Sequence, residues 1–170
     1  RDRYHVFIPS NPNDKPLCCG RTYLSGGLIK QAKQKAHTLI STLAPFAEQQ
    51  IPIVGLEPSC LLALRDELPS LLPTTQAKQI ARMALTFEEL LAKDKPNLQL
   101  VKHAKAYLHS HCHQKAFDVV RPIEQVLKMI EGLDVEKIDS SCCGMAGAFG
   151  YDASTYDLSM LMAEENLLPK

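Results

Sequence analysis

Two copies of the tripeptide Cys-Cys-Gly carry the most specific chemical signal in this sequence. They are Cys18-Cys19-Gly20 and Cys142-Cys143-Gly144. Thiolates are the ligands that sulfur-bound iron and zinc prefer, and an iron-sulfur cluster is normally held by about four of them. A glycine beside each pair lets the backbone approach closely and lets an amide N–H point at a sulfur atom. The two pairs therefore predict metal binding or redox chemistry.

Two further cysteines could complete the two pairs. Cys60 lies downstream of the first pair, directly after Pro58-Ser59, where we expect a helix whose dipole stabilises a thiolate. Cys112 lies upstream of the second pair, within the stretch His109-Ser110-His111-Cys112-His113. The predicted metal ligands are Cys18, Cys19, Cys60, Cys112, Cys142 and Cys143, with His111 and His113 as further or substitute ligands. The glycines predicted to line the cofactor are Gly20, Gly144 and Gly147.

Simpler interpretations compete with metal binding at each position. A buried cysteine is commonly a small core hydrophobe, which for Cys60 alone explains the residue equally well. Any single histidine could donate a ring N–H to a backbone carbonyl or cap a helix. The glycines from Gly144 to Gly150 resemble a phosphate-binding loop, but the lysine and the dinucleotide spacing are missing. Two Cys-Cys-Gly copies, each in a predicted loop, favour the metal interpretation.

Composition excludes several classes of function. The sequence has 170 residues, of which 45% are hydrophobic, so it can bury a core as one domain or as two packed halves. Disorder and a disulfide-stapled secreted domain are therefore disfavoured. Lys plus Arg and Asp plus Glu both number 19, so no positive field favours nucleic acid or anionic lipid. Apolar runs are short and no export signal is visible, so we expect a cytoplasmic protein without a transmembrane segment.

Alternating strand and helix patterns predict the elements that position the cysteines. We expect strands at 4–8, 51–56, 105–109 and 135–139, the second one buried on both faces, and a loop through Asn11 to Asp14. We expect helices at 28–46 (kinked or ended by Pro45), 58–68, 74–91, 114–130 (bent near Pro122) and from Ala153, capped by Ser154. This order predicts an α/β fold of two similar Rossmann-like halves, about 1–95 and 96–170. We expect mostly parallel strands, with the cysteines in loops at their carboxyl ends.

At these residues the chain resembles the cysteine-rich CCG domain family. That family includes the iron-sulfur subunit of glycolate oxidase and one subunit each of anaerobic glycerol-3-phosphate dehydrogenase and heterodisulfide reductase. The resemblance is strongest to the C-terminal part of large FAD-linked D-2-hydroxyacid dehydrogenases. The segments that carry it are Leu17–Gly27, Gly55–Glu67, Leu108–Ala116 and Ser141–Tyr151. Because the chain starts with Arg1, we expect it to be a fragment of a longer protein.

The first half departs from the family motif, which is a cysteine, then Cys-Cys-Gly, then Cys-x-x-Cys. Cys60 matches the first cysteine of the final element, but Ala63 stands where its second cysteine would be. The leading cysteine would lie upstream of Arg1. The first half therefore supplies three thiols and would need a fourth from upstream sequence to complete a four-thiolate site. Without that ligand we expect the cluster to be lost on purification in air.

The second half departs differently. Cys112, Cys142 and Cys143 match the motif, but the terminal pair is absent, so this half also supplies three thiols. A fourth ligand would come from a histidine such as His111 or His113. The alternative is an iron left open, which could bind a substrate thiol or another small ligand.

The resemblance implies an iron-sulfur electron-transfer module, not a complete enzyme. Its implied cofactors are an iron-sulfur cluster, expected to be 4Fe-4S, and FAD in an upstream domain. Its implied partners are upstream FAD and ferredoxin-like domains or subunits, and a quinone or other acceptor, in the cytoplasm or at the inner face of a membrane. The implied substrate is a 2-hydroxy acid of the D-lactate, glycolate or D-2-hydroxyglutarate class. Two alternatives remain: a thiol-disulfide reductase module in which Cys142-Cys143 cycles, and a zinc-binding structural or interaction domain.

Overall fold

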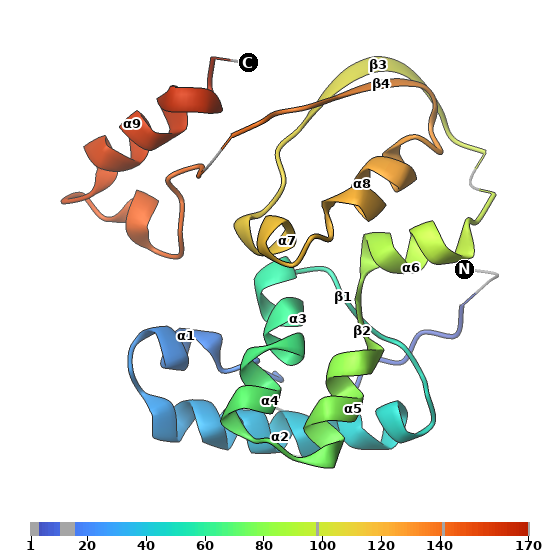
Figure 1. The fold of residues 1–170 in the computed structure, drawn as a ribbon, viewed down its shortest axis with the longest axis vertical. Coiled ribbons are helices and arrows are strands. Elements are labelled where there is room, and N and C mark those ends of the chain that lie inside the picture. The colour runs from blue at the N-terminus through green and yellow to red at the C-terminus, as the bar shows by residue number, and fades with distance from the viewer. Residues whose placement is uncertain (1–3, 11–15, 98, 141, 170) are drawn as a thin grey trace. The chain divides into compact units, whose positions relative to one another are not determined.

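The computed structural model describes residues 4–10, 16–97, 99–140 and 142–169, which form an α/β chain (Figure 1). The chain divides into two compact units, Arg1–Leu90 (unit 1) and Leu91–Lys170 (unit 2). In the described residues each unit contains one pair of parallel strands connected through helices. The predicted α/β class with parallel strands is therefore confirmed. The prediction that the halves are internal repeats stays a prediction.

Unit 1 is mostly helical. Its elements are α1 (Arg21–Ser25), α2 (Ile29–Glu48), β1 (Ile53–Gly55), α3 (Pro58–Arg65), α4 (Glu67–Leu71), α5 (Thr75–Met83) and β2 (Ala84–Thr86). Strand β2 pairs in parallel with β1, with Ile53 opposite Ala84 and Gly55 opposite Thr86. Helix α6 (Phe87–Asp94) follows and spans the boundary between the units.

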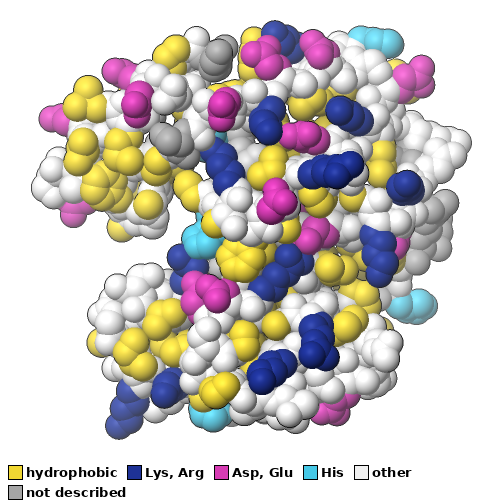
Figure 2. Space-filling view, viewed as in Figure 1, with side chains coloured by type: hydrophobic (Ala, Val, Ile, Leu, Met, Phe, Trp, Pro, Cys, Tyr) yellow, Lys and Arg dark blue, Asp and Glu magenta, His cyan; other side chains and the backbone are white. Residues whose placement is uncertain are grey.

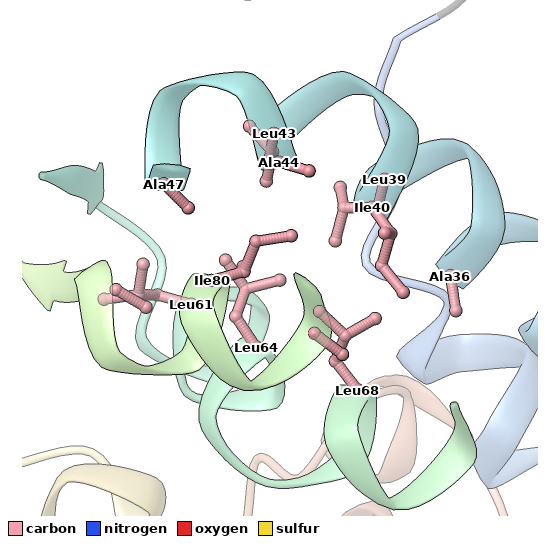
Figure 3. Packing of buried hydrophobic residues seen from close by; sticks show 12 residues of the cluster. Ala36, Leu39, Ile40, Leu43, Ala44, Ala47, Leu61, Leu64, Leu68 and Ile80 are labelled. Carbon is pink, nitrogen blue, oxygen red and sulfur yellow. The ribbon is translucent and has the colours of Figure 1, made fainter. Parts of the chain in front are cut away.

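The core of unit 1 lies between α2 and helices α3 to α5 (Figure 3). The apolar residues of α2 recur at helical spacing, so they form one stripe, and most of that stripe is buried. Its members face Leu61, Leu64, Leu68 and Ile80. Burying each large aliphatic side chain contributes about 1.5–3 kcal/mol. This core is what fixes α3, the helix that carries Cys60.

Helix α2 does not end at Pro45 but runs on to Glu48. Proline lacks an N–H and normally breaks a helix interior. Here Ala44 and Ala47, on either side of Pro45, are both buried in the core and hold the last turn in place. The Pro45 carbonyl also accepts a hydrogen bond from Gln49 Nε2 at 2.8 Å.

The strand predicted at 4–8 is wrong, because residues 4–10 have no regular secondary structure. Val6, Phe7 and Ile8 are 79%, 66% and 89% exposed. An apolar alternation becomes a strand only beside another strand, and within the described residues no strand pairs with this segment. The Phe7 ring instead lies 6.5 Å from the ring of Phe46, centroid to centroid. The loop predicted at Asn11–Asp14 lies outside the described residues.

The helix predicted over 74–91 is also wrong, because β2 interrupts it. Ala84 and Leu85 pair with Ile53 and Val54 and do not continue the helix. The strand predicted at 51–56 exists as the shorter β1 and is only half-buried, with Val54 39% exposed. A sheet of two strands leaves part of each strand uncovered, so burial on both faces is not reached.

Unit 2 contains the longer strand pair. Its elements are β3 (Val101–Leu108), α7 (Cys112–Ala116), α8 (Val120–Leu127), β4 (Glu131–Lys137), the 3₁₀ turn η1 (Phe149–Tyr151) and α9 (Tyr156–Asn166). Strands β3 and β4 are parallel, with Leu108 opposite Lys137 and a register shift between Val101 and Ala104. Both predicted strands are confirmed, but they start earlier in the sequence than expected.

Two helix predictions in unit 2 need correction. The helix predicted over 114–130 is broken between α7 and α8, where Asp118 has a φ of +54°. Pro122 is not at the break but in the first turn of α8, where its missing N–H costs little. Ser154 does not cap the last helix. Its hydroxyl donates to Asp152 at 2.6 Å, and α9 begins after Thr155.

Charges of both signs are interspersed on the surface, and hydrophobic side chains appear on the segment labelled α9 in Figure 1 (Figure 2). Helix α9 buries only Ser159 and Ala163 among its described residues, whereas Leu158 and Leu161 are 53% and 64% exposed. None of the helices in the described part of the chain is long and apolar enough to cross a membrane.

Candidate cysteine sites

The first Cys-Cys-Gly meets Cys60 within unit 1. Cys18, Cys19 and Gly20 lie immediately before α1, and Cys60 is in the first turn of α3. The sulfur atoms of Cys19 and Cys60 are 3.2 Å apart, although the residues are 41 positions apart in the sequence. The Gly20 N–H donates to the Cys18 sulfur at 3.4 Å. Thiols from two distant segments therefore lie together.

Glycine is required at position 20 by the fold of unit 1. Gly20 is buried and has a φ of +81°, a left-handed conformation that other residues rarely adopt. A Cβ there would lie 3.2 Å from the Ala32 carbonyl oxygen and 3.3 Å from Lys35 Cβ, both on α2. The turn thus presses directly on α2. Arg21 pairs with Glu67 at 2.5 Å and ties α1 to α4.

The first turn of α3 holds Cys60 at the surface. Glu57 caps the helix by accepting hydrogen bonds from the Ser59 N–H at 3.0 Å and from the Ser59 hydroxyl at 2.5 Å. Leu61 is 3% exposed and packs closely on Gly55. A Cβ added at Gly55 would lie 2.8 Å from Leu61 Cβ. Cys60 itself is exposed. The cysteine is therefore accessible on a turn whose neighbours are fixed, not a buried core hydrophobe.

A polar network fixes the other end of α3. Arg65 Nε and Nη2 donate to the Ala84 carbonyl at 2.9 and 2.6 Å, and Nη2 pairs with Glu89 Oε2 at 2.5 Å. The same Glu89 oxygen accepts from the Thr86 N–H at 2.8 Å. Sequence reasoning missed these residues. The signal available was the spacing Thr86-x-x-Glu89, which is typical of a helix N-terminus.

The surroundings of Cys60 favour a protonated thiol. Partial burial, the hydrogen bond and charge of Cys19, and the charge of Glu57 together raise the pKa of Cys60 to about 12. The expectation that the helix terminus would stabilise a thiolate is therefore wrong for the metal-free site. A bound metal reverses this preference, because a coordinated thiol is deprotonated.

The second Cys-Cys-Gly meets Cys112 within unit 2. Cys112 is the first residue of α7, and Cys142 and Cys143 lie in the loop after β4. Burial raises the pKa of Cys112, and the nearby Cys142 and Cys143 raise it further, while Lys115 lowers it. The Gly144 N–H donates to the Cys142 sulfur at 3.4 Å, the same contact that Gly20 makes with Cys18. Cysteines from distant segments thus lie together here as well.

Glycines clamp this loop onto α9. Gly144 has a φ of +77°, and a Cβ there would overlap the Ser159 carbonyl oxygen. The Ser159 hydroxyl, on a residue only 3% exposed, donates to the Gly144 carbonyl at 2.8 Å. A Cβ at Gly150 would overlap the Met145 sulfur. Gly147 has a φ of +55° and lies exposed in the loop, so glycine is favoured there by the left-handed backbone and not by packing.

His111 caps α7, one of the structural roles that the sequence left open. Its Nδ1 accepts the His113 N–H at 3.2 Å, and its own N–H donates to Gln114 Oε1 at 3.1 Å. The two rings are stacked, with centroids 5.1 Å apart. With Nδ1 used in the cap, Nε2 is the atom of His111 suited to a ligand.

Two hydrogen bonds fix the junction between β3 and α7. The Ser140 hydroxyl lies 2.8 Å from His109 Nδ1, and Lys115 Nζ donates to the Ser140 carbonyl at 2.5 Å. Burial lowers the pKa of His109, as do the charges of Lys115 and His111. The segment before Cys142 is therefore tied to the segment before Cys112.

The donor set fits an iron-sulfur cluster in its chemistry. Among the described residues, no group of three or more His, Cys, Asp or Glu side chains is arranged to hold a single metal ion. A cluster spreads its thiolate ligands over several iron atoms, and its sulfurs accept hydrogen bonds from backbone amides. The Gly20 and Gly144 N–H groups make such contacts with cysteine sulfur.

Comparisons with known proteins point to dehydrogenases. One subunit of the anaerobic glycerol-3-phosphate dehydrogenase of Escherichia coli (strain K12) is 28% identical over 149 residues, which are 85% of this chain and 38% of the relative. The D-2-hydroxyglutarate dehydrogenase of Haemophilus influenzae is 29% identical over 91% of this chain and 15% of the relative. The D-2-hydroxyglutarate dehydrogenase of Pantoea ananatis is 26% identical over 91% of this chain and 15% of the relative. The chain therefore spans only a minor part of each relative.

No protein-family model matches the chain, and no solved structure matches it either. The curated relatives are therefore the comparisons that bear on function. They share one class, since each is named as a dehydrogenase or as a subunit of one. Along most of its length the chain is similar to a part of an oxidoreductase, as its sequence predicts.

Proposed function

We propose that this chain is the iron-sulfur electron-transfer module of a flavin-linked oxidoreductase that oxidises a 2-hydroxy acid. The observation that carries the proposal is the meeting of cysteines from distant segments in both units. Cys19 and Cys60 lie 3.2 Å apart, sulfur to sulfur, and Cys112 lies close enough to Cys142 and Cys143 for both to raise its pKa. Cysteines that serve only as small apolar residues have no reason to pair in this way twice.

Cys18, Cys19 and Cys60 would be the ligands in unit 1. Cys112, Cys142 and Cys143 would be those in unit 2, with Nε2 of His111 and a ring nitrogen of His113 as substitute donors. When bound, a cluster would supply one-electron transfer. The chain itself would hold the thiolates and, through the Gly20 and Gly144 N–H groups, stabilise negative charge on sulfur, which raises the reduction potential.

The substrate would be oxidised elsewhere in the full-length protein. D-2-hydroxyglutarate, which the names of two of the relatives contain, is a 2-hydroxy acid. D-lactate and glycolate belong to the same chemical class. Their electrons would reach FAD in an upstream domain, then ferredoxin-like clusters and this module, and finally a quinone or another acceptor. The alignment with part of a glycerol-3-phosphate dehydrogenase fits this scheme, because an electron carrier need not contact the substrate.

Anaerobic reconstitution of the full-length protein tests the proposal. Iron and acid-labile sulfide are counted, and visible and electron paramagnetic resonance spectra are recorded before and after adding D-lactate, glycolate or D-2-hydroxyglutarate. We expect bound iron and sulfide, and reduction of the cluster signal by one of these acids. Bound zinc without iron would contradict the proposal and indicate a structural domain. Full activity of an iron-free preparation would instead indicate a thiol-disulfide reductase.

A further inference from the structure

We propose that Cys19 and Cys60 form a reversible disulfide when unit 1 holds no metal, with a low-molecular-weight disulfide such as glutathione disulfide as the oxidant. The two sulfurs are 3.2 Å apart. A disulfide bond is about 2.05 Å long, so closing it needs a movement of roughly 1 Å. The modification site is thus nearly formed in the reduced protein.

The oxidation proceeds by two thiol-disulfide exchanges. One cysteine thiolate attacks glutathione disulfide, forms a mixed disulfide and releases one glutathione thiolate. The second cysteine thiolate then attacks the protein sulfur of that mixed disulfide and releases the other glutathione. The protein loses two protons and two electrons, and glutathione disulfide is reduced to two molecules of glutathione. Attack by Cys19 or by Cys60 first gives the same product, and the raised pKa of Cys60 slows the step that uses its thiolate.

The packing of unit 1 favours this pair over the neighbouring thiol. Cys60 is exposed, so the oxidant can reach it, and Cys19 is half-buried beside it. Gly20 pressed on α2 and Leu61 buried against Gly55 hold the two backbones, so only the side chains need to turn. The Cys18 sulfur is occupied by the Gly20 N–H. A bond between adjacent Cys18 and Cys19 would moreover strain the peptide that joins them.

The disulfide would control metal loading of unit 1, a consequence that rests on the proposed function. Closing the bond removes two of the three thiols that unit 1 offers to a cluster. Iron-bound thiolates are in turn shielded from exchange. Unit 1 would therefore load iron only under reducing conditions, and the loss of its cluster in an oxidising medium would be reversible.

Peptide mapping of the metal-free full-length protein tests the inference. The protein is stripped with a chelator and dithiothreitol under argon, exposed to glutathione disulfide, alkylated with N-ethylmaleimide and digested. We expect a peptide pair linked through Cys19 and Cys60, lighter by two hydrogen atoms, with Cys18 alkylated. Dithiothreitol should release the pair. Cys19 and Cys60 each alkylated or each glutathionylated, with no linked pair, would overturn the inference.

Three serine variants sharpen the assignment. C19S and C60S should each lose the linked pair and show a glutathione adduct on the remaining cysteine, whereas C18S should keep the pair. Loss of the pair in C18S would overturn the assignment to Cys19 and Cys60. Iron counting separates the two proposals. A linked pair in a protein that never loads iron would contradict only the proposed function, and iron loading without a linked pair would contradict only this inference.

Discussion

Each of the two cysteine sites offers three thiols, but the sites are held by different kinds of contact. In unit 1 Cys60 lies on α3, whose Leu61 and Leu64 are buried in the core. Arg65 of the same helix donates a hydrogen bond to a carbonyl of β2. In unit 2 Cys142 and Cys143 lie on a loop that is held through Gly144 and Ser159. Both Cys-Cys-Gly turns need a left-handed glycine, but the first packs on the buried helix α2, whereas the second depends on the contact of its loop with Ser159.

The charges near the two sites also differ. Glu57 lies close enough to Cys60 to raise its pKa, whereas Lys115 lies close enough to Cys112 to lower its pKa. A carboxylate opposes additional negative charge on a cluster, and an ammonium group favours it. A cluster in unit 1 should therefore have a lower reduction potential than one in unit 2.

The largest expected effect is the loss of one cluster without the other. C60S removes a ligand from unit 1 and C112S removes one from unit 2. Each should remove the iron and sulfide of one cluster from the anaerobically reconstituted protein and leave the other unit and the upstream ferredoxin-like clusters loaded, because each unit would hold its own cluster. Iron and sulfide analysis measures this effect. Loss of the iron of both units in either variant would contradict separate sites, and unchanged iron in C60S would remove Cys60 from the ligand set.

A glycine substitution should affect unit 2 more than unit 1. The Cβ added by Gly144→Ala would overlap the Ser159 carbonyl oxygen, and the backbone at this position is left-handed. The substitution should lower the free energy of unfolding by about 3 kcal/mol or more. Gly20→Ala has the same φ penalty but a looser 3.2 Å contact, and should cost about 2 kcal/mol. Urea unfolding measures both. Gly147→Ala is the control with open space around it, and should cost about 1 kcal/mol. An equal loss in all three would contradict the clamp on α9.

Breaking the Arg65 network should affect unit 1 alone. Arg65→Met leaves the Ala84 carbonyl and the Glu89 carboxylate without their donor, and should cost about 2 kcal/mol. Because α3 would then be less well held, the Cys19–Cys60 disulfide should also form more slowly. Arg21→Met is the matched control, since its pair with Glu67 is more exposed and should contribute at most about 1 kcal/mol. An unchanged rate of disulfide formation in Arg65→Met would show that the network does not position Cys60.

Charge removal should bring the two reduction potentials closer together. Glu57→Gln should raise the reduction potential of the cluster in unit 1, and Lys115→Met should lower that of the cluster in unit 2. Each change in the free energy of reduction should be about 1 kcal/mol or less, because both sites are partly exposed to water. Redox titration followed by electron paramagnetic resonance measures both shifts, with C60S and C112S used to assign the signals. Shifts of the opposite sign would refute the electrostatic difference between the units.

The sequence was sufficient for the features that depend on local patterns. The apolar stripe of α2 and the strand-to-helix steps before Cys60 and Cys112 follow from helical periodicity and short apolar runs. The α/β class follows from their order. The approach of Cys19 to Cys60 was expected because loops at the carboxyl ends of parallel strands gather at one edge. Residues 4–10 form no strand, so this reason does not hold for Cys19.

What the sequence could not give depends on tertiary contacts. Strand β2 lies in a stretch with helical apolar spacing, and it is extended because it pairs with β1 and its carbonyl at Ala84 is bonded to Arg65. Residues 4–8 have strand-like residues but no strand beside them in the described structure. The break at Asp118 needs a left-handed residue that no local rule singled out. The raised pKa of Cys60 depends on a neighbour 41 positions away.

The smallest expected effect concerns a motif that both units share. Asp152 accepts hydrogen bonds from the Ser154 N–H and hydroxyl, just as Glu57 does from Ser59 in unit 1. The bonds from Ser154 hold the pKa of Asp152 below its ordinary value of 3.8. A carboxylate whose pKa is depressed by folding stabilises the fold above its unfolded pKa, and that contribution disappears as the pH falls through the folded pKa. The protection of the α9 amides, taken as the exchange rate relative to the intrinsic rate at the same pH, should therefore fall on acidification below 3.8, and Asp152→Asn should reduce that dependence while Glu57→Gln leaves it unchanged. The same pH dependence in Asp152→Asn as in the unaltered protein would show that another carboxylate controls the start of α9.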